Sequence, residues 1–269
     1  MNDRGIASLV MASRAGLHTG TPDIERLYEL GKKRQWNASD LPWESLAFTA
    51  VPLPMRAGLA ELLTQTHYGE LGALTVSAKL VQTSPNLVDR LFGATQVTDE
   101  ARHVEWFSRL LYHLDTPAPM NPAVAAFIDS VVNTKDDLAQ LVGMNILIEG
   151  LAQTLMLESG RLLQSVQMEG LESLPKVGTW LVERIAHDES RHLAFGVTRV
   201  RQLVDCLGTR AKAELQSQIG RWAAGLFALT NQTSVGVVAF GLDGDALMAR
   251  CLRDTRSRLE LAGLTLETA

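Results

Sequence analysis

The chain carries the same five-residue pattern twice, and each copy holds a carboxylate and an imidazole three residues apart. The copies are Asp-Glu-Ala-Arg-His at 99–103 and Asp-Glu-Ser-Arg-His at 188–192. On a helix, residues three apart project from one face, so each Glu-x-x-His offers two metal ligands that point the same way. One such motif arises often by chance. Two copies with matching Asp and Arg neighbours, on facing helices, predict a site for a pair of metal ions.

A pair of metal ions on these motifs needs one further carboxylate from each of two other helices. Glu70 is the candidate on the first long helix, because its neighbours are small or apolar and indicate an interior position. Glu61, near the start of the same helix, is the alternative. Glu149 is the candidate on the third helix, inside an apolar segment where an unpaired charge is costly. Glu158, nearer the expected end of that helix, is the alternative.

The resulting set has four carboxylates and two imidazoles, namely Glu70, Glu100, His103, Glu149, Glu189 and His192. With neutral imidazoles it carries a charge of about −4, which balances two divalent cations. Oxygen-rich ligation with some nitrogen suits Fe(II) or Mn(II) better than Zn(II), whose structural sites prefer thiolate and imidazole. We therefore expect two Fe ions, with Mn or a mixed Mn/Fe pair as the alternative.

The two Asp residues of the repeated pattern are expected to orient the ligand histidines. A ligand histidine commonly donates its second ring N–H to a carboxylate, which fixes the ring. Because Asp188 points away from the metal of its own helix, we expect it to hold His103 on the facing helix. By the same crossing, Asp99 is expected to hold His192. The Arg before each histidine would neutralise these carboxylates; the alternative is that all four charges face solvent.

The elements that would position these residues are helices, since apolar residues recur at helical spacing and strand-like alternation is rare. Prolines and capping residues mark the boundaries. Four long helices are predicted at 55–82, 85–114, 122–158 (with a break near 133–134) and 175–206. Shorter helices are predicted at 22–34, 208–229 and 244–262. We therefore expect an all-α four-helix bundle, with its core at about 55–206 and additional N- and C-terminal helices, in a single domain over 1–269.

The composition gives little support to a nucleic-acid-binding, disulfide-stabilised or membrane-spanning protein. The 269 residues are 46% hydrophobic with a net charge of −5 and no cluster of Lys and Arg, so a nucleic-acid role has little support. Cys206 and Cys251 make neither a disulfide framework nor a thiolate metal site. The sequence shows no apolar run of about 18 residues and no good signal peptide. A cytoplasmic location without a membrane partner is expected.

The paired motif and its predicted partners resemble the ferritin-like di-iron carboxylate superfamily. The resemblance covers about residues 36–200 and is greatest in the oxygen-activating branch. That branch includes ribonucleotide reductase small subunits, their ligand-binding oxidase relatives and bacterial multicomponent monooxygenase hydroxylases. The resemblance implies a ferritin-like bundle in which the six residues bind the metals. Glu70 and Glu149 are carried over by helix position, and the other four by motif.

Two positions depart from the patterns of this superfamily. Phe107 stands four residues after the first ligand histidine, where reductase small subunits place a radical-forming tyrosine, so a stored tyrosyl radical is not expected there. Ile185 stands where the amine N-oxygenases carry a third ligand histidine. His67, one turn before Glu70, is either an extra ligand or a buried, hydrogen-bonded histidine.

The resemblance implies an enzyme, a di-iron, dioxygen-dependent oxidoreductase of the monooxygenase or oxidase type. It would hydroxylate, N-oxygenate or desaturate a small organic substrate. The expected partners are dioxygen, that substrate and an external electron donor (a ferredoxin or reductase), because the sequence has no flavin, Fe–S or haem motif; a homodimer is also expected. The alternatives are an iron storage or detoxification protein and a non-enzymatic bundle with a structural metal site.

Small residues near the two predicted glutamates leave a further choice open. They either leave space for a substrate beside the metals or let the helices pack closely. They are Gly72, Ala73, Gly143, Gly150 and Ala152.

Overall fold

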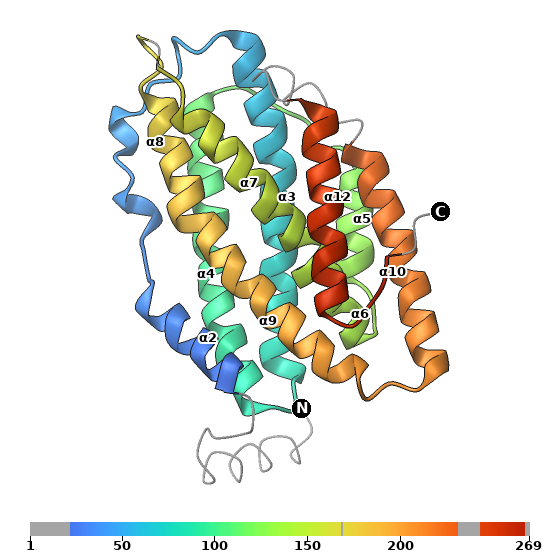
Figure 1. Ribbon diagram of the computed structural model, residues 1–269. Coiled ribbons are helices and arrows are strands. Elements are labelled where there is room, and N and C mark those ends of the chain that lie inside the picture. Colours follow the sequence, from blue (N-terminus) through green and yellow to red (C-terminus); the bar gives the residue numbers. More distant parts are fainter. Residues whose placement is uncertain (1–21, 168, 231–242, 267–269) are drawn as a thin grey trace.

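The computed structural model describes residues 22–167, 169–230 and 243–266, and this part of the chain is built from helices without strands (Figure 1). Four long rods form the bundle, and two of them are composite. The first two are α3 (Leu53–Thr83) and α4 (Leu87–Leu114). The third consists of α6 (Asp137–Leu141), the π-helical η3 (Val142–Ile148) and α7 (Glu149–Gln164). The fourth consists of α8 (Ser173–Trp180), the π-helical η4 (Leu181–Ile185) and α9 (Ala186–Val204). The all-α bundle predicted from the sequence is confirmed.

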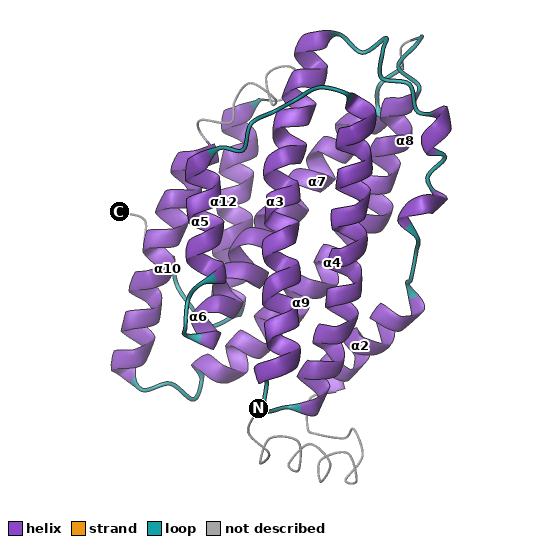
Figure 2. Cartoon of the chain, turned by 180° about the vertical axis from the view of Figure 1, so that it is seen from behind, coloured by secondary structure: helices purple, strands orange, loops and turns teal. Residues whose placement is uncertain are grey.

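Shorter helices cover the bundle on both sides. α2 (Pro22–Lys33) packs against α4 and α9, and the 3₁₀ turns η1 (Ala38–Asp40) and η2 (Trp43–Ser45) follow it. α5 (Pro122–Val132) packs against α3, α10 (Thr209–Thr230) against α5, and α12 (Gly244–Leu261) against α7 and α9. Figure 2, from behind, shows α3 and α4 side by side along the length of the molecule.

The order of the rods includes one long crossover. α3 and α4 are joined by a short turn and run antiparallel, as do the third and fourth rods (Figures 1 and 2). The link from α4 to the third rod contains α5, which returns the chain along the bundle, so that the third rod runs parallel to α4 (Figure 1). A bundle with one such crossover has the connectivity of ferritin-like proteins.

A polar layer divides the interior into two apolar clusters. On α4, Phe92 belongs to one cluster, Trp106 belongs to the other, and Glu100 lies between them. Across the bundle, Phe195 of α9 stacks on Phe92 with ring centroids 4.0 Å apart. Burying a large apolar side chain stabilises the fold by about 1.5–3 kcal/mol, whereas a buried carboxylate carries a desolvation penalty. The two apolar clusters therefore stabilise the bundle, whereas the charged layer between them lowers its stability.

The third rod differs from its prediction at one end. It begins after a break at 133–136, near the predicted break, where Asp136 caps α6 by accepting a hydrogen bond from the Ala139 N–H at 2.9 Å. It continues to Gln164, beyond the predicted end at 158, so that prediction was wrong. Gly160 lies within the helix. It allows close packing against the fourth rod, because a Cβ there would lie 2.6 Å from the Val182 side chain.

The third rod is also apolar along most of its length. Asp137–Gln164 is long and apolar enough to span a membrane, but 72% of its most apolar window is buried inside the protein. This burial is typical of the central helix of a packed bundle.

Candidate metal centre

The six candidate ligands come from all four rods and lie together in the interior, each at most 4% exposed. Their ligand atoms form two groups, each within 4.8 Å. One group consists of Glu70, Glu100, His103 and Glu189, and the other of Glu100, Glu149 and His192. Because Glu100 belongs to both groups, it lies where a carboxylate could bridge two ions.

His103 directs one ring nitrogen into the cluster and the other out of it. Its Nδ1 lies 3.2 Å from carboxylate oxygens of Glu70, Glu100 and Glu189. Its Nε2 lies 3.4 Å from Oδ2 of Asp188 on the facing rod. In this position, Nδ1 is the atom that could bind a metal ion, and Nε2 faces the carboxylate of Asp188, which would hold the ring.

His192 has the matching arrangement on the opposite rod. Its Nδ1 is 3.1 Å from Oε1 of Glu100, and its Nε2 is 3.2 Å from Oδ2 of Asp99. The structure thus places each Asp of the repeated pattern beside the histidine of the other copy. The i, i+3 spacing puts the ligands on one face of each helix, and the antiparallel packing of α4 and α9 produces the crossing.

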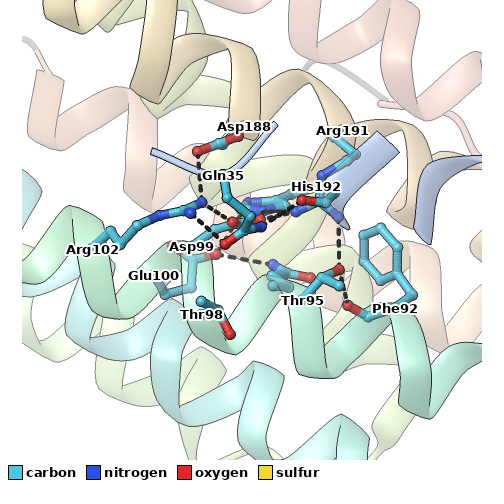
Figure 3. Close-up of polar contacts among 12 residues, drawn as sticks. Gln35, Phe92, Thr95, Thr98, Asp99, Glu100, Arg102, Asp188, Arg191 and His192 are labelled. Carbon is cyan, nitrogen blue, oxygen red and sulfur yellow. Dashed lines mark hydrogen bonds and ion pairs between the residues drawn. The ribbon is translucent and has the colours of Figure 1, made fainter. Parts of the chain in front are cut away.

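Both aspartates are held by cations within the protein. Asp99 pairs with Arg102 and Arg191, which approach it from different sides, and Arg102 also lies 3.4 Å from Asp188 (Figure 3). The indole Nε1 of Trp36 donates to Oδ2 of Asp188 at 2.7 Å. All four charged residues are buried, so the alternative of solvent-facing charges does not hold. The sequence gives no sign of the contact between Trp36 and Asp188, because the two residues are 152 positions apart.

Two amide side chains that the sequence analysis did not single out hold Glu149. Gln96 Nε2 donates to Glu149 Oε1 at 2.8 Å and to Glu100 Oε1 at 3.1 Å, while Asn145 Nδ2 donates to Glu149 Oε2 at 2.8 Å. Gln96 lies four residues before Glu100, and Asn145 lies four residues before Glu149. An amide one helical turn before a ligand carboxylate is the signal that would have found both residues.

The cluster without metal ions holds protons. Burial, reinforced by the charges of Glu189 and Glu100, raises the pKa of Glu70 to about 8, and burial also raises the pKa of Glu149. Burial alone would lower the pKa of His192, but the Glu100 and Glu189 carboxylates outweigh it and raise that pKa to about 10. At neutral pH, Glu70 and His192 are therefore mostly protonated.

Several buried polar atoms in the cluster meet no hydrogen-bond geometry in the described part of the chain, although a histidine or carboxylate lies 3.1–3.7 Å from each of them. They are Glu100 Oε2, both carboxylate oxygens of Glu189, and His192 Nδ1. Leaving such an atom unsatisfied costs about 1–3 kcal/mol. Divalent ions would satisfy these atoms, and a carboxylate–imidazole donor set suits Fe or Mn. The residues present therefore fit a pair of such ions, and their role as ligands remains a prediction.

The rival residues lie outside both ligand groups. Glu158 forms ion pairs with Arg161 and Arg250. His67 Nε2 is 3.0 Å from the Ser108 hydroxyl, and His67 belongs to neither group.

An apolar cavity of about 150 Å³ reaches the cluster from one side. Helices α3, α5, α7 and α12 line it, with single residues from η3 and α9, and Glu70, Glu149 and Glu189 face it. Gly69, Ala73 and Ala152 also line this cavity. The other small residues serve close packing: a Cβ on Gly72, Gly143 or Gly150 would lie 2.8–3.0 Å from the side chains of Ile128, Val131 or Arg258, respectively.

No family model matches the sequence, and no curated protein matches it. Solved structures of R2-like ligand-binding oxidases share its fold. One without metal cofactor has a TM-score of 0.70 and 18% sequence identity, over 88% of this chain and 96% of the oxidase. One with an aerobically reconstituted metal cofactor after photoconversion has a TM-score of 0.70 and 18% identity, over 93% and 96%. A point mutant with an anaerobically reconstituted Mn/Fe cofactor has a TM-score of 0.69 and 19% identity, over 88% and 92%.

These similarities establish the fold of the chain as the ferritin-like fold of the R2-like oxidases.

Proposed function

We propose that the chain is a dimetal oxidase that uses dioxygen to oxidise a small organic substrate. The observation that carries this proposal is a buried set of six candidate ligands, several of whose oxygen and nitrogen atoms lack a hydrogen bond in the described part of the chain, directly beside an apolar cavity. A structural metal site needs no such cavity. The fold shared with R2-like ligand-binding oxidases supports the same class of chemistry.

Different parts of the site have different roles in this proposal. Asp188 and Asp99 hold the two histidine rings, and the cavity excludes water while it places an apolar substrate against the Glu70–Glu149–Glu189 side of the cluster. Two Fe or Mn ions bound there would supply the reduction of dioxygen, with electrons from an external donor such as a ferredoxin or reductase. The Mn/Fe cofactor of a structural neighbour supports a mixed pair as an alternative to two Fe ions.

Anaerobic reconstitution followed by metal analysis tests the proposal. We expect about two Fe or Mn ions per chain and dioxygen consumption that increases when an apolar substrate fills the cavity. Less than one bound ion per chain would refute the dimetal centre. Accumulation of thousands of Fe ions per assembly would instead indicate iron storage, and two ions without dioxygen consumption would indicate a structural site.

A further inference from the structure

Glu149 is held differently from the other candidate ligands. Each of its carboxylate oxygens accepts one amide hydrogen bond at 2.8 Å, from Gln96 and from Asn145. The two oxygens of Glu189 accept no amide hydrogen bond in the described part of the chain, and they lie 3.2 Å from His103 Nδ1 and 3.7 Å from His192 Nδ1. An amide on each oxygen fixes the orientation of the Glu149 carboxylate and still leaves each oxygen a lone-pair direction for a metal ion.

Both amides lie in the packed interior of the bundle. Asn145 lies in the π-helical turn η3, and α9 closes on this turn at Gly196, where a Cβ would lie only 2.5 Å from the Asn145 Cβ. Gln96 lies on α4 and is 1% exposed.

A second cavity ends at these two amides. It has a volume of about 130 Å³, and it shares no lining residue with the apolar cavity. Its walls are more polar and include Ser77, Gln140 and the buried ion pair of Asp89 with Arg199. Gln96 and Asn145 therefore separate Glu149 from a polar space on one side, while the apolar cavity touches Glu149 directly.

We propose that Gln96 and Asn145 are positioning residues that orient Glu149, so that the Glu149 metal position, which is filled second, depends on both amides for its affinity. The inference rests on the proposed dimetal centre. The other position gathers three carboxylates and one imidazole, from Glu70, Glu100, Glu189 and His103, whereas the Glu149 position gathers two carboxylates and one imidazole. The first divalent ion is attracted more strongly by the larger negative charge, and it then repels the second.

Stepwise loading with Mn(II) tests the inference on the full chain under anaerobic conditions. The variants are Gln96→Met and Asn145→Leu, which remove one amide donor each at similar volume. Electron paramagnetic resonance separates isolated Mn(II) from a coupled pair, and competition with a chelator gives the two affinities. We expect the first affinity to be unchanged and the second to fall by about 10–100-fold, the usual effect of losing a group that orients a metal ligand.

The matched control is Gln140→Met. Gln140 is equally buried and lines the same polar cavity, but its amide donates to the backbone carbonyls of Val131 and Val132. This variant should lower the melting temperature and leave both Mn(II) affinities unchanged.

Three outcomes would overturn the inference. An unchanged second affinity in both amide variants, or an equal loss of both affinities, would show that the amides do not support the Glu149 position selectively. A Gln140→Met variant with the same selective loss would show a general effect of destabilisation. Failure of the wild-type chain to bind one Mn(II) would instead refute the dimetal centre itself, so the two failures are distinguishable. Since each amide holds its own oxygen, either variant alone is a sufficient test if the other does not fold.

Discussion

At the scale of single residues, the cluster is a set of charged groups held apart from water. Each buried ion costs several kcal/mol in desolvation, and the attraction between partners offsets only part of that cost. The raised pKa values of Glu70 and His192 lower the net charge of the cluster in two ways: protonated Glu70 is neutral, and protonated His192 is a cation that pairs with Glu100. Such perturbed groups concentrate at functional sites.

The protonation of the cluster predicts a pH dependence of metal binding. Metal ions bind deprotonated ligands, so loading must release the protons that Glu70 holds below about pH 8 and His192 holds below about pH 10. The apparent affinity for Mn(II) should therefore rise with pH, about tenfold per pH unit for each proton released. Titrations between about pH 6 and 8 check this. A constant affinity over that range would show that the ligands are already ionised without metal.

The ligand set predicts the effect of removing single donors. Glu100→Ala removes the carboxylate shared by both groups, and His192→Ala removes the only imidazole of the second group. Each variant should lower metal content after anaerobic reconstitution from about two ions to at most one. His67→Ala is the control, because His67 contacts Ser108 outside both groups, and its loading should stay unchanged. Normal loading of Glu100→Ala would refute the ligand assignment.

At the scale of elements, two rods contain a π-helical turn just before their ligands. η3 ends directly before Glu149, and η4 ends three residues before Asp188. Insertions of this kind are rare and occur often at functional sites. Helical periodicity and capping residues placed the rods to within a few residues, as for α3, predicted at 55–82 and observed at Leu53–Thr83. Neither signal marks the π-turn η3, because its residues are buried at nearly every position and show no one-sided apolar pattern whose phase could be read.

Close contact between the third and fourth rods gives a prediction on stability. A Cβ on Gly178 would lie 2.5 Å from the Gly160 carbonyl oxygen and 2.7 Å from the Gln164 nitrogen, both of which are backbone atoms. Gly178→Ala should therefore lower the free energy of unfolding by about 1–3 kcal/mol through overpacking. Urea denaturation measures this change.

The matched control is Gly220→Ala in α10, where an added Cβ meets nothing within 4 Å. It should raise the free energy of unfolding by about 0.5–1 kcal/mol through helix propensity. If both variants change the free energy of unfolding by the same amount, the close contact between the third and fourth rods does not restrict residue size at Gly178.

At the scale of the whole molecule, the apolar cavity lies where α3, α5, α7 and α12 meet beside the cluster. Ala152→Phe would fill part of this space. We expect unchanged metal content and a loss of substrate-stimulated dioxygen consumption of about tenfold or more, since a misplaced substrate costs orders of magnitude in rate. An oxygen electrode and metal analysis measure the two quantities.

The control for the filled cavity is Ala94→Phe, on an exposed position of α4. It should change neither metal content nor dioxygen consumption. Unimpaired turnover in Ala152→Phe would show that the substrate binds elsewhere.

The sequence alone determined the helices and the predicted ligand set, because helical periodicity and the i, i+3 spacing of Glu and His are local properties of the chain. It also pointed to Glu70 and Glu149, since a charge in an apolar helix needs a partner. Only the tertiary structure decided which small residues line a cavity and which pack, and that Trp36, Gln96 and Asn145 hold the ligands. Those contacts depend on how distant helices meet, and their geometry is set by packing across the bundle, which local spacing does not encode.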